Sequence, residues 1–244
     1  MQAMRFGRVA LAVAVTIAFG ASRASATSIV IDNFSSVNVG TTQTVAFTAP
    51  NTGSNLDTGL SGVLGGSRLL DFTVSGSPQS NSFEVNTAIT SLSLNVGAGD
   101  NGTGAVTYNA NGAVGGLNEA FLTALGTTAA NTFFQAAIDF SDLNLGFRVD
   151  LFDGVNNAFY TTNLGSGASA VSVPFSLFTG AGLVDFNSID SIKITLSGPT
   201  SQDAIVRLLE VTDTPVPEPA SMLLLGTGLI GIGQAVRRRR AARS

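Results

Sequence analysis

The sequence predicts an all-β fold, an antiparallel β-sandwich or jelly roll, placed between two terminal signals. Three observations support this prediction. Apolar and polar residues alternate along short runs, Gly, Asn, Ser and Thr interrupt these runs, and both ends have the composition of export or sorting signals. We therefore divide the 244 residues into a signal peptide at 1–26, a β-sandwich ectodomain at 27–214 and a sorting tail at 215–244.

The amino terminus has the three parts of a secretory signal peptide. Two arginines precede an apolar stretch at 9–20, and Ala24 and Ala26 supply the small residues that signal peptidase requires. We expect cleavage after Ala26, so that the mature protein begins at Thr27. The alternative is an uncleaved membrane helix, but this stretch is shorter than the roughly 20 residues that a helix needs to span a bilayer.

The ectodomain contains nine runs with the character of β-strands. Ile192, Ile194 and Leu196 alternate with polar residues, as a half-buried antiparallel strand requires. Repeated Gly-rich and Asn-rich segments between the runs favour hairpins. One short helix is expected at 119–125, capped by Asn118. The expected strands are 28–34, 43–48, 68–75, 88–96, 105–110, 143–152, 170–175, 189–196 and 204–211.

The composition excludes many kinds of chemistry. The chain has no His and no Cys, so it cannot form a Ser-His-Asp triad, a cysteine nucleophile, a disulfide or a histidine-ligated haem. A glycosidase with paired carboxylates remains open, although the chain has no Trp and only two Tyr to line a sugar cleft. We therefore predict that the protein is not an enzyme.

The ectodomain is strongly acidic. It has four basic residues against fifteen Asp and Glu, which gives a formal net charge of −11. Such a charge repels phosphate groups, so binding to nucleic acid is not expected. The single domain of 27–214 is long enough to bury a substantial core.

The segment 150–157 is the strongest candidate for a cation site. Asp150, Asp153 and Asn156 place carboxylate and amide oxygens around a turn that contains Gly154, and such oxygens are ligands for calcium. The spacing is not that of an EF-hand. The alternative is an Asn- and Asp-rich hairpin turn that binds no metal.

The carboxyl-terminal tail has three parts in a fixed order. Pro217, Glu218 and Pro219 form a rigid, extended element, because proline fixes φ and restricts the residue before it. An apolar run at 220–236 follows, and as a helix it would be about 25 Å long. The tail ends with a cluster that opposes translocation and so stays on the cytoplasmic side: Arg237, Arg238, Arg239 and Arg240. A simple single-pass anchor is the alternative to a sorting signal.

This tail resembles the PEP-CTERM sorting domain of Gram-negative bacteria. The resemblance implies that an exosortase recognises Pro217, Glu218 and Pro219 and cleaves nearby. It also implies an inner-membrane intermediate, followed by a place at the cell surface or in the exopolysaccharide of a biofilm matrix. The function predicted on this basis is a non-catalytic exported surface or matrix protein.

The carboxyl half of the ectodomain resembles galactose-binding-type jelly rolls. The resemblance covers 172–178, 186–192 and 205–211, and that class includes many carbohydrate-binding modules. It implies a second hypothesis, a carbohydrate-binding module that binds its ligand with or without calcium. Tyr108 and Tyr160 are the only candidates for stacking a Tyr or Trp ring on a sugar, and most of the sixteen Phe residues are expected in the core.

Overall fold

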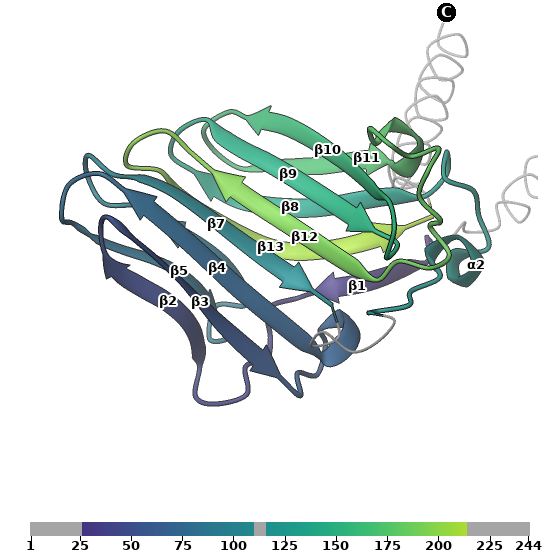
Figure 1. Cartoon of the computed structure of the whole chain (residues 1–244), viewed down its shortest axis with the longest axis horizontal. Helices are drawn as coiled ribbons and strands as arrows, with labels where there is room; N and C mark the ends of the chain where they lie inside the picture. Colours follow the sequence, from purple (N-terminus) through teal and green to yellow (C-terminus); the bar gives the residue numbers. More distant parts are fainter. Residues whose placement is uncertain (1–25, 110–115, 214–244) are drawn as a thin grey trace, which may run out of the picture.

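The computed structural model describes residues 26–109 and 116–213, which form an antiparallel β-sandwich (Figure 1). The short helical elements are η1 (Leu64–Gly66), α2 (Phe121–Leu125) and η3 (Phe175–Leu177). The strands in the described residues are β1 (Ser28–Asp32), β2 (Thr42–Thr48), β3 (Asn51–Thr58), β4 (Ser67–Ser75), β5 (Ser80–Asn86), β6 (Ser91–Asn95), β7 (Asn101–Tyr108), β8 (Phe133–Ser141), β9 (Leu145–Phe152), β10 (Asn157–Leu164), β11 (Ser169–Pro174), β12 (Ser191–Ser197) and β13 (Asp203–Thr212).

The strands form two sheets that pack face to face. One sheet has seven strands in the order β11-β8-β13-β6-β5-β2, with β1 also paired to β13. The other has six strands in the order β10-β9-β12-β7-β4-β3. All the pairings are antiparallel, and the predicted fold class is confirmed.

Each of the nine predicted runs contains a strand, but the sequence prediction missed β3, β5, β8 and β10. The strand β3 has the sequence NTGSNLDT, which is typical of a turn. It forms because all eight of its residues pair with β4, the only neighbour of this edge strand in the six-stranded sheet of the described residues. In β8, the residues QAA have no strong β preference, although the Phe and Ile residues on either side of them do. This strand is fixed by pairing with β11 on one side and β13 on the other.

The predicted helix is shorter than expected, and its predicted cap is wrong. Asn118 has a positive φ of 48°, and Glu119 forms a β-bridge with Ile189, so the helix begins only at Phe121. The N-cap position is Ala120, which makes no side-chain capping bond. Gly126 ends the helix in the left-handed conformation that glycine adopts without steric cost.

Aromatic pairs join the two sheets through the core. Phe72 of β4 lies 6.0 Å from Phe83 of β5, and Phe134 of β8 lies 6.2 Å from Phe147 of β9, measured between ring centroids. All four rings are fully buried. A Cβ atom on Gly104 would lie 2.6 Å from the Phe83 ring, so the close packing of the sheets requires glycine at this position.

A buried polar network also joins the sheets. Arg68 of β4 is fully buried, and its guanidinium donates hydrogen bonds to Asp32 Oδ2 at 2.7 Å, Gln43 Oε1 at 2.8 Å and the Ser36 carbonyl at 2.9 Å. Tyr108 of β7 donates its hydroxyl to the same Asp32 oxygen at 3.0 Å. Since Asp32 and Gln43 belong to the seven-stranded sheet and Arg68 and Tyr108 to the other, the network ties both sheets together.

The charges of this network are balanced inside the protein. Burial raises the pKa of Asp32, while the Arg68 charge and hydrogen bonds from Arg68, the Phe34 amide and the Tyr108 hydroxyl oppose that shift. Burial and the neighbouring Asp32 carboxylate raise the pKa of Tyr108 well above its usual range, so this hydroxyl stays protonated. Removing one partner would leave another polar group buried without compensation.

Both ends of the described chain lie at the same end of the sandwich. Ser28 at the start of β1 pairs with Thr212 at the end of β13, and Asp213 exchanges hydrogen bonds with Thr27. In Figure 1 this end lies at the right, near α2. Within 26–109 and 116–213, no helix is long and apolar enough to cross a membrane. The predicted signal peptide up to residue 25 and the predicted span at 220–236 lie outside the described residues.

Replacing Arg68 should destabilise the fold severely. We expect Arg68→Met to lower the free energy of unfolding by about 3–5 kcal/mol, because it leaves the Asp32 carboxylate buried and unpaired. The matched control is Arg207→Met, which breaks a partly exposed ion pair with Asp139 and should cost about 1 kcal/mol or less. Urea unfolding of residues 27–213 measures both values. Equal losses in the two variants would contradict a central role for the buried pair.

Candidate functional site

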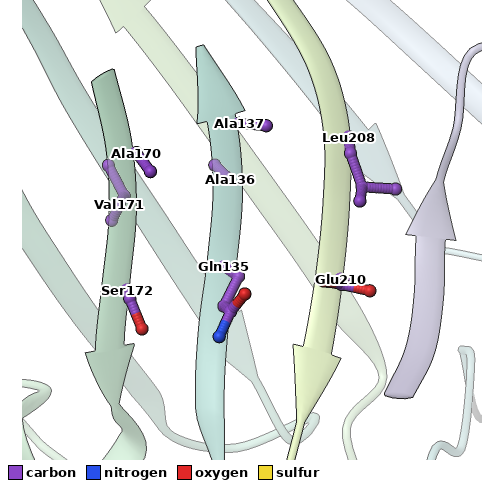
Figure 2. Close-up of a pocket in the computed structure, with 8 residues that line it drawn as sticks. All are labelled: Gln135, Ala136, Ala137, Ala170, Val171, Ser172, Leu208 and Glu210. Atoms are coloured by element: carbon purple, nitrogen blue, oxygen red, sulfur yellow. The ribbon is translucent and has the colours of Figure 1, made fainter. Parts of the chain in front are cut away.

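The outer face of the seven-stranded sheet carries the candidate binding site. Ser172, Gln135 and Glu210 lie side by side on β11, β8 and β13, because they are direct cross-strand partners. Figure 2 shows this polar row with Ala170, Ala137 and Leu208 in the next row along the strands. Together they line a hollow of about 90 Å³.

A second hollow of about 220 Å³ lies on the same sheet, over β5, β6, β13 and β8. One row of cross-strand partners across it is Glu84, Ser93, Ile205 and Phe140. The next row is Ser82, Asn95 and Asp203. The site therefore combines hydroxyl, amide and carboxylate groups with one phenyl ring, whose side chain is 43% exposed.

Arg207 of β13 separates the two hollows along the strand. It pairs with Asp139 of β8 and donates to the Ile89 carbonyl, and both partners fix its position. The other basic residues between 27 and 213 are Arg68, which is buried, and Arg148 and Lys193, which belong to the six-stranded sheet. Arg207 is therefore the one basic side chain on this sheet in the described residues.

The two tyrosines expected to stack on a sugar do not lie on the outer face of the seven-stranded sheet, because both belong to the six-stranded sheet. Tyr108 is fully buried and bonded to Asp32, so the expectation that it could stack on a sugar is wrong. Tyr160 of β10 is half-buried and packs at 6.0 Å from Phe178, away from both hollows. The exposed aromatic of the candidate site is Phe140, which the sequence did not single out. The expectation that most Phe residues lie in the core is confirmed.

The three residues predicted to bind calcium fall into two hydrogen-bonded groups. Asp153 and Asn156 meet in the β9–β10 turn, where Asp153 Oδ1 accepts from the backbone N–H groups of Val155 and Asn156. Asp150 lies on β9, and both of its oxygens accept hydrogen bonds from Arg148. In the described residues, no group of three or more carboxylates is arranged to hold a metal. Calcium binding at this turn stays a prediction.

The Asp153 carboxylate organises the turn electrostatically. The Asn156 backbone N–H lowers the pKa of Asp153 to about 2, with further contributions from the Asp185 and Val155 N–H groups and the Asn156 side chain. Burial acts to raise the pKa of Asp150, but hydrogen bonds from Arg148 and Asn157 outweigh it and lower the value. Both carboxylates are therefore charged at neutral pH, and both already have protein partners.

Comparison with known families identifies the tail as a sorting signal. The PEP-CTERM protein-sorting motif matches residues 215–240. The chain is thus of the class of exported proteins that exosortase sorts and processes at the cell envelope. Ala26 is half-buried beside β1. The remaining predicted sorting residues lie outside the described residues: Ala24, Pro217, Glu218, Pro219, Arg237, Arg238, Arg239 and Arg240.

Solved structures similar to the sandwich include two of family 11 carbohydrate-binding modules from Clostridium thermocellum. One, from the cellulosomal cellulase Lic26A-Cel5E, is 12% identical with a TM-score of 0.39, covering 77% of this chain and 95% of that one. The other, in complex with a β-1,3-1,4-mixed-linked tetrasaccharide, is 15% identical with a TM-score of 0.38, covering 77% and 96%. An exo-β-agarase is 9% identical with a TM-score of 0.40, covering 78% and 25%. No curated protein sequence matches the chain.

Neutralising Asp153 should lower the free energy of unfolding only at pH values at which its carboxylate is ionised in the natural protein. We expect Asp153→Asn to cost about 1 kcal/mol at pH 7, since exposure to solvent screens these hydrogen bonds. The folded pKa is below the unfolded one, so this contribution is present above about pH 4 and disappears as the pH falls toward 2. Urea unfolding at pH 7 and near pH 2 measures it.

The same experiment tests calcium. Addition of calcium that stabilises the natural protein but not Asp153→Asn would establish the predicted cation site. If the natural protein has the same free energy of unfolding in calcium and in chelator, the turn does not bind calcium and is held by its hydrogen bonds alone. If Asp153→Asn lowers the free energy of unfolding as much near pH 2 as at pH 7, the electrostatic explanation is contradicted.

Proposed function

We propose that the mature protein is a non-catalytic component of the cell surface or extracellular matrix that binds exopolysaccharide through the outer face of its seven-stranded sheet. The sorting motif at 215–240 carries this proposal, because it marks the chain for export and processing. Gram-negative origin and a biofilm setting are part of the proposal. The polar rows on the sheet supply the groups that would contact the polymer.

The shape of the face favours a polymer over a small molecule. Pockets for small molecules usually enclose about 300–1,000 Å³ and bury most of the ligand. The two hollows here have about 90 and 220 Å³, and they share β8 and β13. A chain molecule lying across several strands would contact both. Phe140 would offer an apolar surface, and the neighbouring serine and amide groups would form hydrogen bonds with sugar hydroxyls.

The charge of the ectodomain favours a neutral polysaccharide. Its net charge of −11 repels uronate and sulfate groups, and the face itself carries Glu84, Asp203 and Glu210. Arg207 is already paired with Asp139. Carboxylates can accept hydrogen bonds from the hydroxyl groups of neutral sugars without a compensating cation.

The arrangement of acids supports binding without catalysis. Glu84 and Asp203 line the same hollow, two strands apart and offset along the strands, and both lie on the outer face of one sheet. A glycosidase holds its two carboxyl groups about 5–9.5 Å apart on either side of the scissile bond, whereas a sugar chain lying on this face would have both carboxylates on the same side. Release of reducing sugar from a purified polysaccharide would contradict this part of the proposal.

Removing hydrogen-bonding groups from the first hollow should weaken polysaccharide binding. We expect the double variant Gln135→Ala, Ser172→Ala to bind about 30-fold less tightly, for two lost bonds of about 1 kcal/mol each. The matched control is Thr161→Ala, Thr195→Ala, which removes two hydroxyls from one cross-strand row of the other sheet. Affinity electrophoresis in neutral exopolysaccharide, with calcium and with chelator, measures both.

If the natural protein binds neither neutral nor acidic polysaccharides, with calcium or with chelator, polysaccharide binding is rejected. Equal weakening by the control would contradict the assignment of binding to the seven-stranded sheet.

Sorting should depend on the Pro-Glu-Pro element. We expect intact-mass spectrometry to show loss of the tail near residues 217–219 in a host with exosortase, and an intact tail when exosortase is deleted. We expect Glu218→Ala to retain the tail, because it removes the charged group of the element. A tail that stays intact in every strain would instead support a single-pass anchor.

A further inference from the structure

Exposed apolar side chains gather at one end of the sandwich. In the described residues, the four most exposed large apolar side chains are Val155, Val39, Leu183 and Leu177, at 83, 81, 72 and 67%. Val39 lies in the loop between β1 and β2. The other three lie in the β9–β10 turn and in the segment from η3 to β12, and hydrogen bonds and strand pairing place these two segments at the same end. We call Val155, Leu177 and Leu183 the apolar tips.

Hydrogen bonds and strand order connect these segments. Val155 lies in the β9–β10 turn, where Asp153 Oδ2 accepts from the Asp185 N–H at 2.9 Å and so holds the loop that carries Leu183. Thr179 in the same loop forms a bridge with Phe159 of β10. Leu177 ends η3, which directly precedes this loop. The apolar tips are not among the residues that line the two hollows of the seven-stranded sheet.

The chain leaves the sandwich at this same end. Pro174, which precedes η3, pairs with Phe133, and Phe133 pairs with Thr212 at the end of β13. Thr27 is hydrogen-bonded to Asp213 beside it. Figure 1 shows the ends of β9 and β13, α2 and the start of β1 together on the right. Both the signal peptide and the sorting tail therefore continue from the end that carries the apolar tips.

The sequence keeps this end close to the membrane. Six residues separate Asp213 from the predicted span at 220–236, and three of them are proline. Six residues can span at most about 20 Å, whatever their conformation. We propose that, before the tail is cleaved, the apolar tips insert into the outer leaflet and hold the sandwich upright on the lipid surface.

Charge determines which lipid surface suits this contact. The turn and loop that carry the apolar tips contain Asp153, Asp185 and Asp190, and they contain no Lys or Arg. Attraction to anionic lipid therefore does not drive the contact. The apolar side chains supply the attraction, as they do at membrane interfaces, and phosphatidylcholine is sufficient. This separates the inference from electrostatic docking of a basic surface.

Site-specific fluorescence quenching tests the inference on the full-length protein, made in a host without exosortase so that the tail is retained. The chain has no cysteine, so Val155→Cys, Leu177→Cys and Leu183→Cys each take up a single fluorophore. We expect phosphatidylcholine liposomes with nitroxide-labelled acyl chains to quench all three probes relative to nitroxide-free liposomes. The control is Ser166→Cys, exposed in the β10–β11 turn at the opposite end of these strands, which should not be quenched.

A second variant separates insertion from simple proximity. With the probe at position 155, Leu177→Ser together with Leu183→Ser should reduce quenching, while Val39→Ser should leave it unchanged. Absence of quenching at the three tips, or equal quenching at position 166, would overturn the inference. A blue shift without quenching would also overturn it, because a protein partner or a second copy would then cover the tips. None of these outcomes bears on polysaccharide binding by the mature protein.

Discussion

The buried contact of Arg68 with Asp32 is the interaction on which the sandwich most depends. The chain has no cysteine, so no disulfide can hold the two sheets together. The guanidinium instead bonds Asp32 and Gln43 across the interior, and the Tyr108 hydroxyl completes the set. Asp32 ends β1, the strand next to the carboxyl-terminal end of β13. The network thereby fixes the segment that enters the fold from the signal peptide. Buried ionic groups cost free energy to desolvate, and here every charge has a partner.

Short-range pattern was enough to predict the strands whose side chains alternate between core and solvent. β12 and β9 are clear cases, since every second residue is buried. It was not enough for β3, whose residues have weak β preference, or for β8, whose Phe and Ile residues are separated by Gln135, Ala136 and Ala137. Both strands are held in place by the neighbouring strands that pair with them. Arg68 illustrates the same limit. Its partners lie 25 and 36 residues away, and nothing near it in the sequence distinguishes it from an exposed arginine.

The candidate binding face could be predicted only in part, for a related reason. A row such as Ser172, Gln135 and Glu210 depends on three strands from distant parts of the sequence, and its central strand, β8, was not predicted. Phe140 is a similar case, because its exposure follows from an irregular register between β8 and β13. The sorting signal needs no such information. Its residues are contiguous, and an enzyme can read them as a linear segment, so the sequence alone was sufficient to identify it.

The placement of the two chain ends explains how the domain tolerates processing. β13 ends at Thr212, before the Pro-Glu-Pro element at 217–219, so cleavage there leaves in place every sheet hydrogen bond between the described residues. At the other junction, the Thr27 N–H donates to Asp213 Oδ1 at 3.0 Å. Predicted cleavage after Ala26 would turn that N–H into an ammonium group beside a carboxylate, and a charge-assisted bond of this kind is stronger than a neutral one. Removal of the signal peptide would thus strengthen the contact that closes β1 against β13, while removal of the tail leaves it in place.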